Sequence, residues 1–258
     1  MKLYILSISV LSLFFTTVTT GQQNLLKDSI RLTARPDTIS LDAASTAVIV
    51  VDMQNDFGAK GGMFDKAGID ISMIQKVVDP TAAVLASARK KGIKIIYLKM
   101  GIKPDLSDLG SMEYPTRAKR AKRMHIGDTL LAPNGKASRI FINDTWNTEI
   151  LPQLQPQADD IIIHKNRFNG FYQTSLDSVL RSLGKKYLII TGCTTSVCVE
   201  STVRDASFRG FMPIVLADCT AEPLGAGFAR SNYDASLFII QAFFGLISTS
   251  KEFITAIE

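Results

Sequence analysis

The stretch YLIITGCTTSVCVESTVRDASFRGFMPIVLAD, residues 187–218, contains a complete strand–helix–strand unit. It begins with the apolar run 187–191 and ends with the apolar run 212–218, and both runs are typical of strands that are buried on both faces. Between them, residues 197–209 predict a helix. A helix between two such strands places them parallel in one sheet, because the chain must cross the sheet to return.

The same alternation of strands and helices continues on both sides of this unit. Short apolar runs that predict further strands lie at residues 47–51, 93–100 and 159–165 and near Leu246. Further predicted helices lie at residues 80–92, 174–184 and 227–244. We therefore predict an α/β fold of three layers, in which helices cover both faces of a doubly wound, mainly parallel six-stranded sheet of the Rossmann-like type.

One globular domain accounts for most of the chain. The sequence has 258 residues, of which 46% are hydrophobic and 21% are charged, and it contains no internal period and no low-complexity block. Residues 46–258 are therefore expected to form a single domain. Residues 22–45 are polar and contain proline, which is typical of an arm over the domain or a tether.

Residues 1–21 have the pattern of a secretory signal peptide. A positive start is followed by the mostly apolar residues 3–15 and by a small-residue exit, with cleavage expected near Thr20 or Gly21. An uncleaved membrane anchor is the alternative, but the apolar stretch is short for a membrane span and no basic stop follows it. The sequence thus predicts a secreted or periplasmic protein with no membrane partner after signal cleavage.

Three chemically reactive side chains lie where predicted strands end. Asp52 and Lys165 each end a strand, and Cys198 follows a glycine-led turn after another. In open parallel sheets, ligands bind outside the carboxyl ends of the strands. We therefore expect these three residues to converge on one edge of the sheet.

A thiol, an amine and a carboxylate at one edge can perform acyl-transfer chemistry. At the first turn of a helix, the macrodipole and the unpaired N–H groups favour a thiolate at Cys198, and Lys165 is expected to lower the thiol pKa further. Asp52 can take the thiol proton and later deliver it to a leaving amine, while backbone amides of residues 194–198 can hold the oxyanion. Taken singly, each residue also fits a structural role as a helix cap, a strand-end charge or a packing residue.

The cysteines fit neither a disulfide framework nor a metal cluster. Three cysteines is an odd number, and Cys193 and Cys198 lie within one strand-to-helix turn, a poor position for a disulfide that links distant parts of a fold. No CxxC pair is present, and the two histidines, His125 and His164, lie in unrelated segments. We expect no metal and no other cofactor, a packing or backbone role for Cys193, and no role for Cys219.

The segment TRAKRAKRMH, residues 116–125, concentrates positive charge in a chain whose net charge is +5. Its basic residues are Arg117, Lys119, Arg120, Lys122 and Arg123. Three interpretations remain open: a solvated helix face, a contribution to holding an anionic substrate, and nucleic-acid binding. Because no aromatic residues are interleaved for base stacking, we expect no nucleic-acid partner.

Three motifs resemble the cysteine hydrolases of the isochorismatase-like superfamily. They are VIVVDMQNDF (48–57), HKNRFNGFYQTSLDSVLRSLG (164–184) and ITGCTTSVCVESTVRDASFRGFMPIVLADC (190–219). The resemblance runs in the right order from about residue 46 to about residue 250. It implies the fold predicted above, catalytic roles for Asp52, Lys165 and Cys198, an oxyanion hole at Thr194 and Cys198, and a cis peptide bond between Cys193 and Thr194.

Within the superfamily, the sequence most resembles the ureido-group amidohydrolases of the ureidoacrylate and biuret types. The stretches that carry this similarity are AKGGMFDKAGIDIS (59–72), NGFYQTSLDSVLR (169–181), CVESTVRD (198–205) and FFGLIS (243–248). Nicotinamidases have a metal site with histidines near the second strand, whereas YLKMGIKPDLSD (97–108) has no histidine. Isochorismatases lack the nucleophilic cysteine.

The resemblance therefore implies a cysteine-dependent amidohydrolase that cleaves a C–N bond of a small amide or ureido compound through a covalent acyl- or carbamoyl-cysteine. The alternatives are another amidase, of the N-carbamoyl amino acid or nicotinamide type, and a secreted binding protein without catalysis on the same fold. Beside the motifs lie candidate substrate-binding residues: Gln54, Asn55, Phe57, Phe171, Tyr172 and Gln241. The expected partners are a small-molecule substrate and further copies of the chain, in a dimer or tetramer.

Overall fold

The computed structural model describes residues 29–225 and 227–258. The predicted signal peptide, residues 1–21, lies outside the described residues. Six strands form one sheet in the order β10-β9-β8-β3-β4-β7, and every neighbouring pair is parallel, which confirms the predicted fold class. The strands are β3 (Thr46–Val51), β4 (Lys94–Met100), β7 (Ile161–Lys165), β8 (Tyr187–Cys193), β9 (Met212–Ala221) and β10 (Leu246–Ser248).

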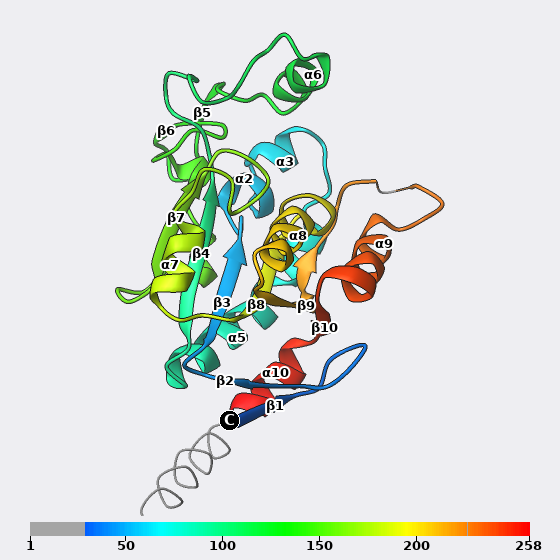
Figure 1. Ribbon diagram of the computed structural model, residues 1–258. Helices are drawn as coiled ribbons and strands as arrows, with labels where there is room; N and C mark the ends of the chain where they lie inside the picture. Colours follow the sequence, from blue (N-terminus) through cyan, green and yellow to red (C-terminus); the bar gives the residue numbers. More distant parts are fainter. Residues whose placement is uncertain (1–28, 226) are drawn as a thin grey trace, which may run out of the picture.

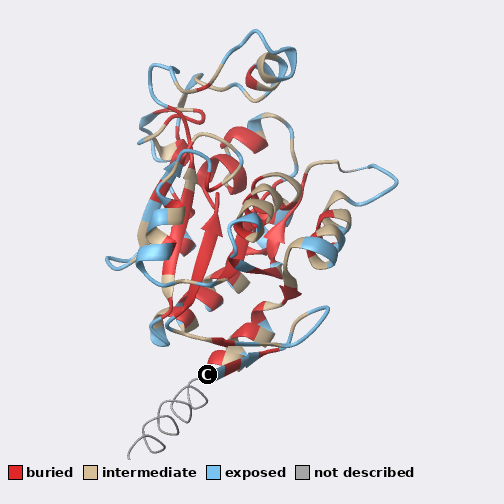
Figure 2. Ribbon diagram, viewed as in Figure 1, coloured by how far each residue is buried: buried red, intermediate tan, exposed pale blue. Residues whose placement is uncertain are grey.

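Helices cover both faces of this sheet (Figure 1). One layer contains α4 (Ser72–Lys76), α5 (Val78–Lys90) and α10 (Ser250–Ile257), and the other contains α7 (Leu176–Ser182), α8 (Glu200–Phe208) and α9 (Asn232–Ile239). Successive side chains of a strand point to opposite faces. In β3, Val48 and Val50 therefore pack towards the first layer, and Ala47 and Ile49 towards the second. Figure 2 shows the resulting buried strands between partly exposed helices.

The described part of the N-terminal arm is an ordered hairpin. Strands β1 (Ser29–Leu32) and β2 (Ile39–Asp42) pair antiparallel beside α10. The side chains of Ile30, Leu32 and Leu41 are buried in the core of the first layer. These contacts make the hairpin part of the folded domain, so residues 29–42 do not act as a tether.

Two elements near the C-terminus differ from the sequence prediction. The long helix predicted at residues 227–244 begins only at Asn232, because Ser231 caps it by accepting the N–H of Asp234, and it ends in a π-helical turn, η4 (Ile240–Phe244). Helix α10 was not predicted from the sequence. Thr249 caps α10, and Phe253 and Ile257 bury its apolar face against the core.

The carboxyl ends of the strands are covered by short elements between β3 and β7 (Figure 1). They are α2 (Asn55–Gly58), α3 (Met63–Lys66), α6 (Pro115–Arg123), the hairpin β5 (Thr129–Leu131) and β6 (Ala137–Arg139), and the 3-10 turn η1 (Trp146–Thr148). A second 3-10 turn, η2 (Pro152–Leu154), packs against α5. No helix in the described part of the chain combines the length and the apolar composition needed to cross a membrane.

Candidate active site

Three side chains that are far apart in the sequence meet beyond the carboxyl ends of β3, β7 and β8. Asp52 directly follows β3, Lys165 is the last residue of β7, and Cys198 lies in the turn after β8. All three are buried, and the thiol of Cys198 interacts with both of the other groups. The structure thus brings together the three residues that the sequence placed at one edge of the sheet.

The ammonium group of Lys165 is surrounded by acceptors. Its Nζ atom donates to Asp52 Oδ2 at 2.7 Å, Arg167 O at 3.2 Å, Phe168 O at 3.3 Å and Met100 Sδ at 3.3 Å. Burial alone would lower the pKa of Lys165, but the negative charge of Asp52 reverses this effect and the pKa is raised. The lysine therefore keeps its positive charge beside the thiol.

The two carboxylate oxygens of Asp52 differ in their contacts with the described residues. Oδ2 accepts from Lys165, whereas Oδ1 is buried and has no hydrogen-bond partner among the described residues. The backbone of Asp52 lies in the left-handed region, at a φ of 53°, and such strained residues cluster at functional sites. Burial raises the pKa of the Asp52 carboxyl against the opposing charge of Lys165. A carboxylate with an unpaired oxygen and a raised pKa has the properties of a general base.

The expectation that Cys198 has a lowered pKa is wrong for the resting site. Burial raises the pKa of the thiol far above its usual range. The charge of Lys165 acts in the expected direction and lowers it, but it does not overcome burial, to which the negative charge of Asp52 adds. The thiol is therefore protonated at neutral pH, and a base must remove its proton during the reaction.

The turn between β8 and α8 carries the amide groups next to the thiol. The peptide bond between Cys193 and Thr194 is cis, and the π-helical turn η3 (Thr195–Val199) follows it. The carbonyl of Thr194 accepts from the N–H groups of Val197, at 3.1 Å, and Val199, at 3.2 Å. Outside the turn itself, the N–H groups of Thr194 and Cys198 have no backbone acceptor in the described part of the chain. Two donors of this kind beside a nucleophile can bind an oxyanion.

Two buried side chains that take no part in these contacts hold the turn in place. Glu222, just beyond β9, accepts the N–H of Ser196 at 2.5 Å and the N–H of Leu224 at 3.0 Å. The thiol of Cys193 donates to the backbone carbonyl of Asp52 at 3.2 Å. Cys193 therefore connects the turn to the end of β3, which agrees with the packing role expected for it.

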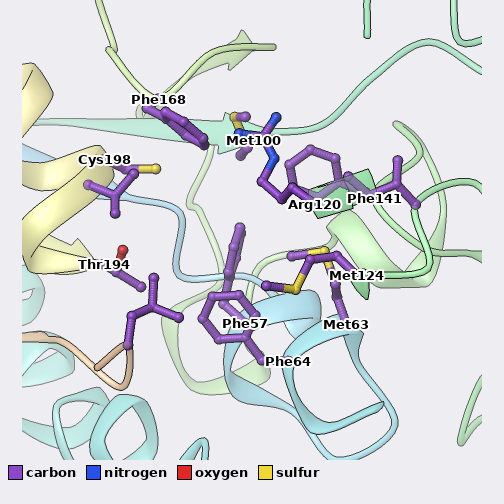
Figure 3. A pocket seen from close by; sticks show the side chains of 13 residues that line it. Phe57, Met63, Phe64, Met100, Arg120, Met124, Phe141, Phe168, Thr194 and Cys198 are labelled. Atoms are coloured by element: carbon purple, nitrogen blue, oxygen red, sulfur yellow. The ribbon is translucent and has the colours of Figure 1, made fainter. Parts of the chain in front are cut away.

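A cavity of about 320 Å³ opens at the Cys198 thiol (Figure 3). Its walls consist mainly of aromatic and methionine side chains, among them Phe57, Phe64, Phe141, Phe168, Met63 and Met124. Arg120 is the one charged side chain among the described residues that line it. A concave, mostly apolar site with few polar groups is typical of a pocket for a small molecule.

Of the six candidate substrate-binding residues, only Phe57 belongs to the described lining of this cavity. The side-chain amide of Gln54 is buried, donating to two backbone carbonyls at 2.8 and 2.9 Å and accepting a backbone N–H at 2.7 Å. Nδ2 of Asn55 donates to the carbonyl of Trp146 at 2.8 Å. The Gln54 amide is thus fully engaged with the backbone, and the Asn55 amide anchors the segment at Trp146, so neither amide faces the described cavity.

The other three candidates also lie outside the described lining. Phe171 is buried and stacks on Phe211 with 5.8 Å between ring centroids, which makes it a core residue of the second layer. Tyr172 is 47% exposed, and Gln241 lies in η4. Proximity to a motif in the sequence did not identify the cavity residues: Asn55 and Phe57 share the short helix α2, yet only Phe57 lines the described cavity.

Asp56 is a structurally important residue that the sequence analysis missed. Its Oδ1 accepts from Asn147 Nδ2 at 2.5 Å and from the N–H of Met63 at 3.0 Å, and its Oδ2 accepts from the N–H of Phe141 at 2.7 Å. Burial raises the pKa of Asp56 to about 7, although all three hydrogen bonds lower it. Since Met63 and Phe141 line the cavity, Asp56 fixes two of its walls relative to each other.

The basic cluster on α6 faces two ways. Lys119, Lys122 and Arg123 are exposed, as in a solvated helix face. Arg117 and Arg120 are half-buried and line cavities, which agrees with a contribution to holding an anion. The structure therefore agrees with two of the three interpretations left open by the sequence: a solvated helix face for the exposed residues and a contribution to holding an anion for the half-buried ones.

The histidines lie apart from the triad. Nδ1 of His125 is 3.2 Å from Asp128 Oδ2 on the surface, and the exposed His164 points away from the core on β7. Among the described residues, no three His, Cys, Asp or Glu side chains come together as a set of metal ligands.

Comparisons with known proteins give one family. Residues 46–252 match the model of the isochorismatase domain. A ureidoacrylate amidohydrolase (RutB) of Caulobacter segnis is 38% identical over 87% of this chain and 90% of its own length, and RutB of Pantoea ananatis is 37% identical over 88% and 87%. The crystal structure of a cysteine hydrolase from Pseudomonas syringae pv. phaseolicola superposes with a TM-score of 0.70 at 30% identity, over 84% of this chain and 94% of that one.

Proposed function

The chain belongs to the isochorismatase family and is an amidohydrolase, and from this premise we propose that it hydrolyses a ureido compound of the ureidoacrylate type through a covalent intermediate on Cys198. The observation that carries the proposal is the buried pair of Asp52 and Lys165 against a thiol at the end of a small cavity. A base, a fixed positive charge and a nucleophile are the groups that acyl transfer requires. The similarity to ureidoacrylate amidohydrolases over most of both chains supports the choice of substrate.

The first half of the reaction forms a bond between sulfur and carbon. Oδ1 of Asp52 takes the proton of the Cys198 thiol as the sulfur attacks the carbonyl carbon of the scissile C–N bond. The carbonyl oxygen becomes an oxyanion, which accepts from the N–H groups of Thr194 and Cys198. The C–N bond then breaks, and Asp52 returns its proton to the departing nitrogen. Ammonia or an amine leaves, and Cys198 carries an acyl or carbamoyl group.

The second half restores the enzyme with one water molecule. Asp52 takes a proton from the water as the water oxygen attacks the carbonyl carbon of the intermediate. The C–S bond then breaks, and the proton returns to the sulfur of Cys198. Lys165 keeps its charge throughout and stabilises the negative charge that moves between carboxylate and sulfur.

Ammonia release from a panel of substrates tests this function. The panel contains ureidoacrylate, biuret, N-carbamoyl amino acids and nicotinamide, and we expect the highest kcat/KM for a ureido compound. Cys198→Ala should abolish turnover, whereas Cys219→Ala, a matched change at a buried cysteine that lies outside the described cavity lining, should retain it. Turnover by Cys198→Ala at the wild-type rate, or activity on nicotinamide alone, would remove the basis for the proposal.

We also propose that residues 1–21 direct export and are removed, which makes the mature protein secreted or periplasmic. The support is the sequence pattern of a charged start, an apolar stretch and a small-residue exit. N-terminal sequencing of the protein from a periplasmic extract should find a start near residue 21 or 22. A cytosolic protein that retains Met1 would contradict this.

We propose, finally, that the mature chain forms a homo-oligomer. The support is a group of exposed aromatic side chains on α8, α9 and η4, in which Phe208 is 75%, Phe238 61% and Phe243 72% exposed. Apolar groups clustered on a surface in this way are typical of an interface. Light scattering should give the mass of a dimer or tetramer, and Phe243→Glu should shift it to that of the monomer. A monomeric wild type at micromolar concentration would contradict the proposal.

A further inference from the structure

Arg120 lies at the junction of three adjoining cavities. One is the cavity of about 320 Å³ at the Cys198 thiol. The second, of about 230 Å³, is lined in part by Arg117, Arg120 and Arg167, and the third, of about 410 Å³, by Tyr114, Thr116, Arg117 and Arg120. Arg120 therefore borders both the space at the nucleophile and the two spaces beside α6, where Arg117 and Arg167 add positive charge.

Three arginines line these cavities, namely Arg117, Arg120 and Arg167. Among the described residues, no carboxylate lies within ion-pair distance of Arg117, Arg120 or Arg167. Arg117 and Arg167 donate to backbone carbonyls instead, Arg117 to that of Ser111 at 3.0 Å and Arg167 to that of Asp108 at 2.8 Å. Positive charge is therefore concentrated here without the compensation that ion pairs provide.

Among the described residues, Arg120 has the fewest hydrogen-bond partners of the three arginines. In the described part of the chain its guanidinium group has no hydrogen-bond acceptor, and it is stacked over the ring of Phe168 at 4.7 Å from the centroid. Burial and the like charge of Arg117 lower the pKa of Arg120, so its charged form is placed at some cost. A bound anion would remove this cost, because a guanidinium group binds a carboxylate through two parallel hydrogen bonds.

The position of Arg120 relative to Cys198 defines what kind of molecule fits between them. Both side chains face the same cavity from different sides, and the walls between them are mainly aromatic and methionine side chains (Figure 3). A small neutral ureido compound would meet the thiol and the two amide donors but would leave the guanidinium group unpaired. A molecule with a ureido group at one end and a carboxylate at the other would satisfy both ends of the cavity.

We propose that Arg120 binds the carboxylate of the substrate and so selects ureido acids, the class to which ureidoacrylate belongs, while Arg117 and Arg167 add to the positive charge that attracts the anion. This rests on the proposed function, because it assumes that the ureido carbonyl lies at Cys198. Arg120 is then a specificity-determining residue. It discriminates ureido acids from neutral ureido compounds such as biuret.

Binding to a protein that cannot react tests this assignment. In the Cys198→Ala background, we compare the Kd of 3-ureidopropionate with that of its methyl ester, which has the same ureido group and no charge. The acid should bind more tightly than the ester. Adding Arg120→Gln should weaken binding of the acid about 10- to 100-fold, the usual effect of losing a charge-assisted hydrogen-bonding pair, and should change ester binding less than about threefold.

Two further variants serve as controls. Arg123→Gln makes the same chemical change on the same helix at an exposed position, and it should leave both Kd values unchanged. Arg120→Lys keeps the charge without the planar fork and should recover part of the preference for the acid. If the ester binds the Cys198→Ala protein as tightly as the acid, or if Arg120→Gln weakens both ligands equally, Arg120 does not bind the carboxylate.

The binding result is independent of the proposed reaction, because no nucleophile is present. A preference for the acid that depends on Arg120, in an enzyme whose wild type releases no ammonia from any ureido compound, would overturn the proposed function and leave the anion site in place. The reverse outcome is that wild type and Arg120→Gln both hydrolyse neutral and acidic ureido compounds with equal kcat/KM. This would overturn the role of Arg120 in binding the carboxylate and leave the proposed function in place.

Discussion

Lys165 Nζ lies 2.7 Å from Asp52 Oδ2, and both side chains are fully buried. Removing one partner of such a pair leaves an uncompensated charge in the interior, which is strongly destabilising. The pair is also asymmetric, because the ammonium group has further acceptors while the second carboxylate oxygen, Oδ1, has none among the described residues. This asymmetry indicates different roles for the two residues: Lys165 keeps a constant positive charge, and Asp52 transfers a proton.

The first prediction concerns Lys165. Lys165→Met should lower kcat/KM by about 10²- to 10³-fold, the effect of losing one preorganised electrostatic group. It should also raise the pH at which Cys198 is alkylated, because the lysine charge lowers the thiol pKa. Lys165→Arg should rescue little, since a planar fork does not fit the acceptors of a compact ammonium group.

The alkylation rate of Cys198 with iodoacetamide, followed against pH, checks this, with exposed Lys119→Met as the matched control. In all of these proteins, alkylation should be slow at neutral pH, because the resting thiol is protonated. Identical midpoints in wild type and Lys165→Met would mean that Lys165 does not act on the cysteine.

The second prediction concerns the acid limb of the pH–activity profile. Asp52 must be ionised to accept the thiol proton, and burial raises the pKa of its carboxyl above the ordinary value of 3.8. Activity should therefore fall as the pH decreases through a midpoint above 3.8. Asp52→Asn should lose about 10²- to 10⁴-fold in kcat/KM, as expected for a general base. A wild-type profile of kcat/KM that stays flat down to pH 4 would contradict the role of Asp52.

The third prediction concerns stability and Asp56, whose pKa is raised to about 7 by burial. Between about pH 4 and about pH 7 the unfolded chain releases this proton while the folded protein retains it, so the free energy of unfolding falls as the pH rises. The raised pKa sets an upper limit on this loss of about 4 kcal/mol.

Urea unfolding of wild type and of Asp56→Asn, each at several pH values, measures this effect. The other titrating groups are the same in both proteins, so the difference between the two free energies of unfolding reports on Asp56. The stability of wild type relative to the variant should decrease from about pH 4 to about pH 7. A pH-independent difference between the two would show that Asp56 is ionised throughout this range.

The fourth prediction concerns metals. Asp52, Lys165 and Cys198 account for the proton transfers and the covalent bond of the proposed reaction. Dialysis against a chelator should therefore leave kcat/KM unchanged. A large loss that zinc or iron restores would show that the active site requires a metal ion.

The convergence of the triad could be predicted from the sequence because it depends on topology alone. Residues that end parallel strands meet at one edge whatever the details of packing, and Asp52, Lys165 and Cys198 follow this rule. The ionisation of Cys198 could not be predicted in this way. The helix position and the lysine both favour a thiolate, but the opposing effect of burial depends on how closely other segments cover the site.

The lining of the cavity could not be predicted for a similar reason. Met124, Phe141 and other wall residues come from residues 101–150, where no strand–helix alternation sets the direction of side chains. Their positions follow from tertiary contacts, in particular the bonds from Asp56 to the backbone of Phe141 and to Asn147. The charged cluster containing Arg120 was visible in the sequence, but only the fold separates its half-buried members from its exposed ones.

The measurement that tests the central claim most directly is the mass of the peptide containing Cys198 during turnover. The wild type is mixed with the substrate that the panel identifies, quenched in acid within the first turnovers, digested and analysed by mass spectrometry. We predict that this peptide carries the added mass of the acyl or carbamoyl group, that the peptide containing Cys219 does not, and that Asp52→Asn reduces the adduct. Rapid turnover with an unmodified Cys198 peptide, together with an active Cys198→Ala variant, would contradict the covalent mechanism.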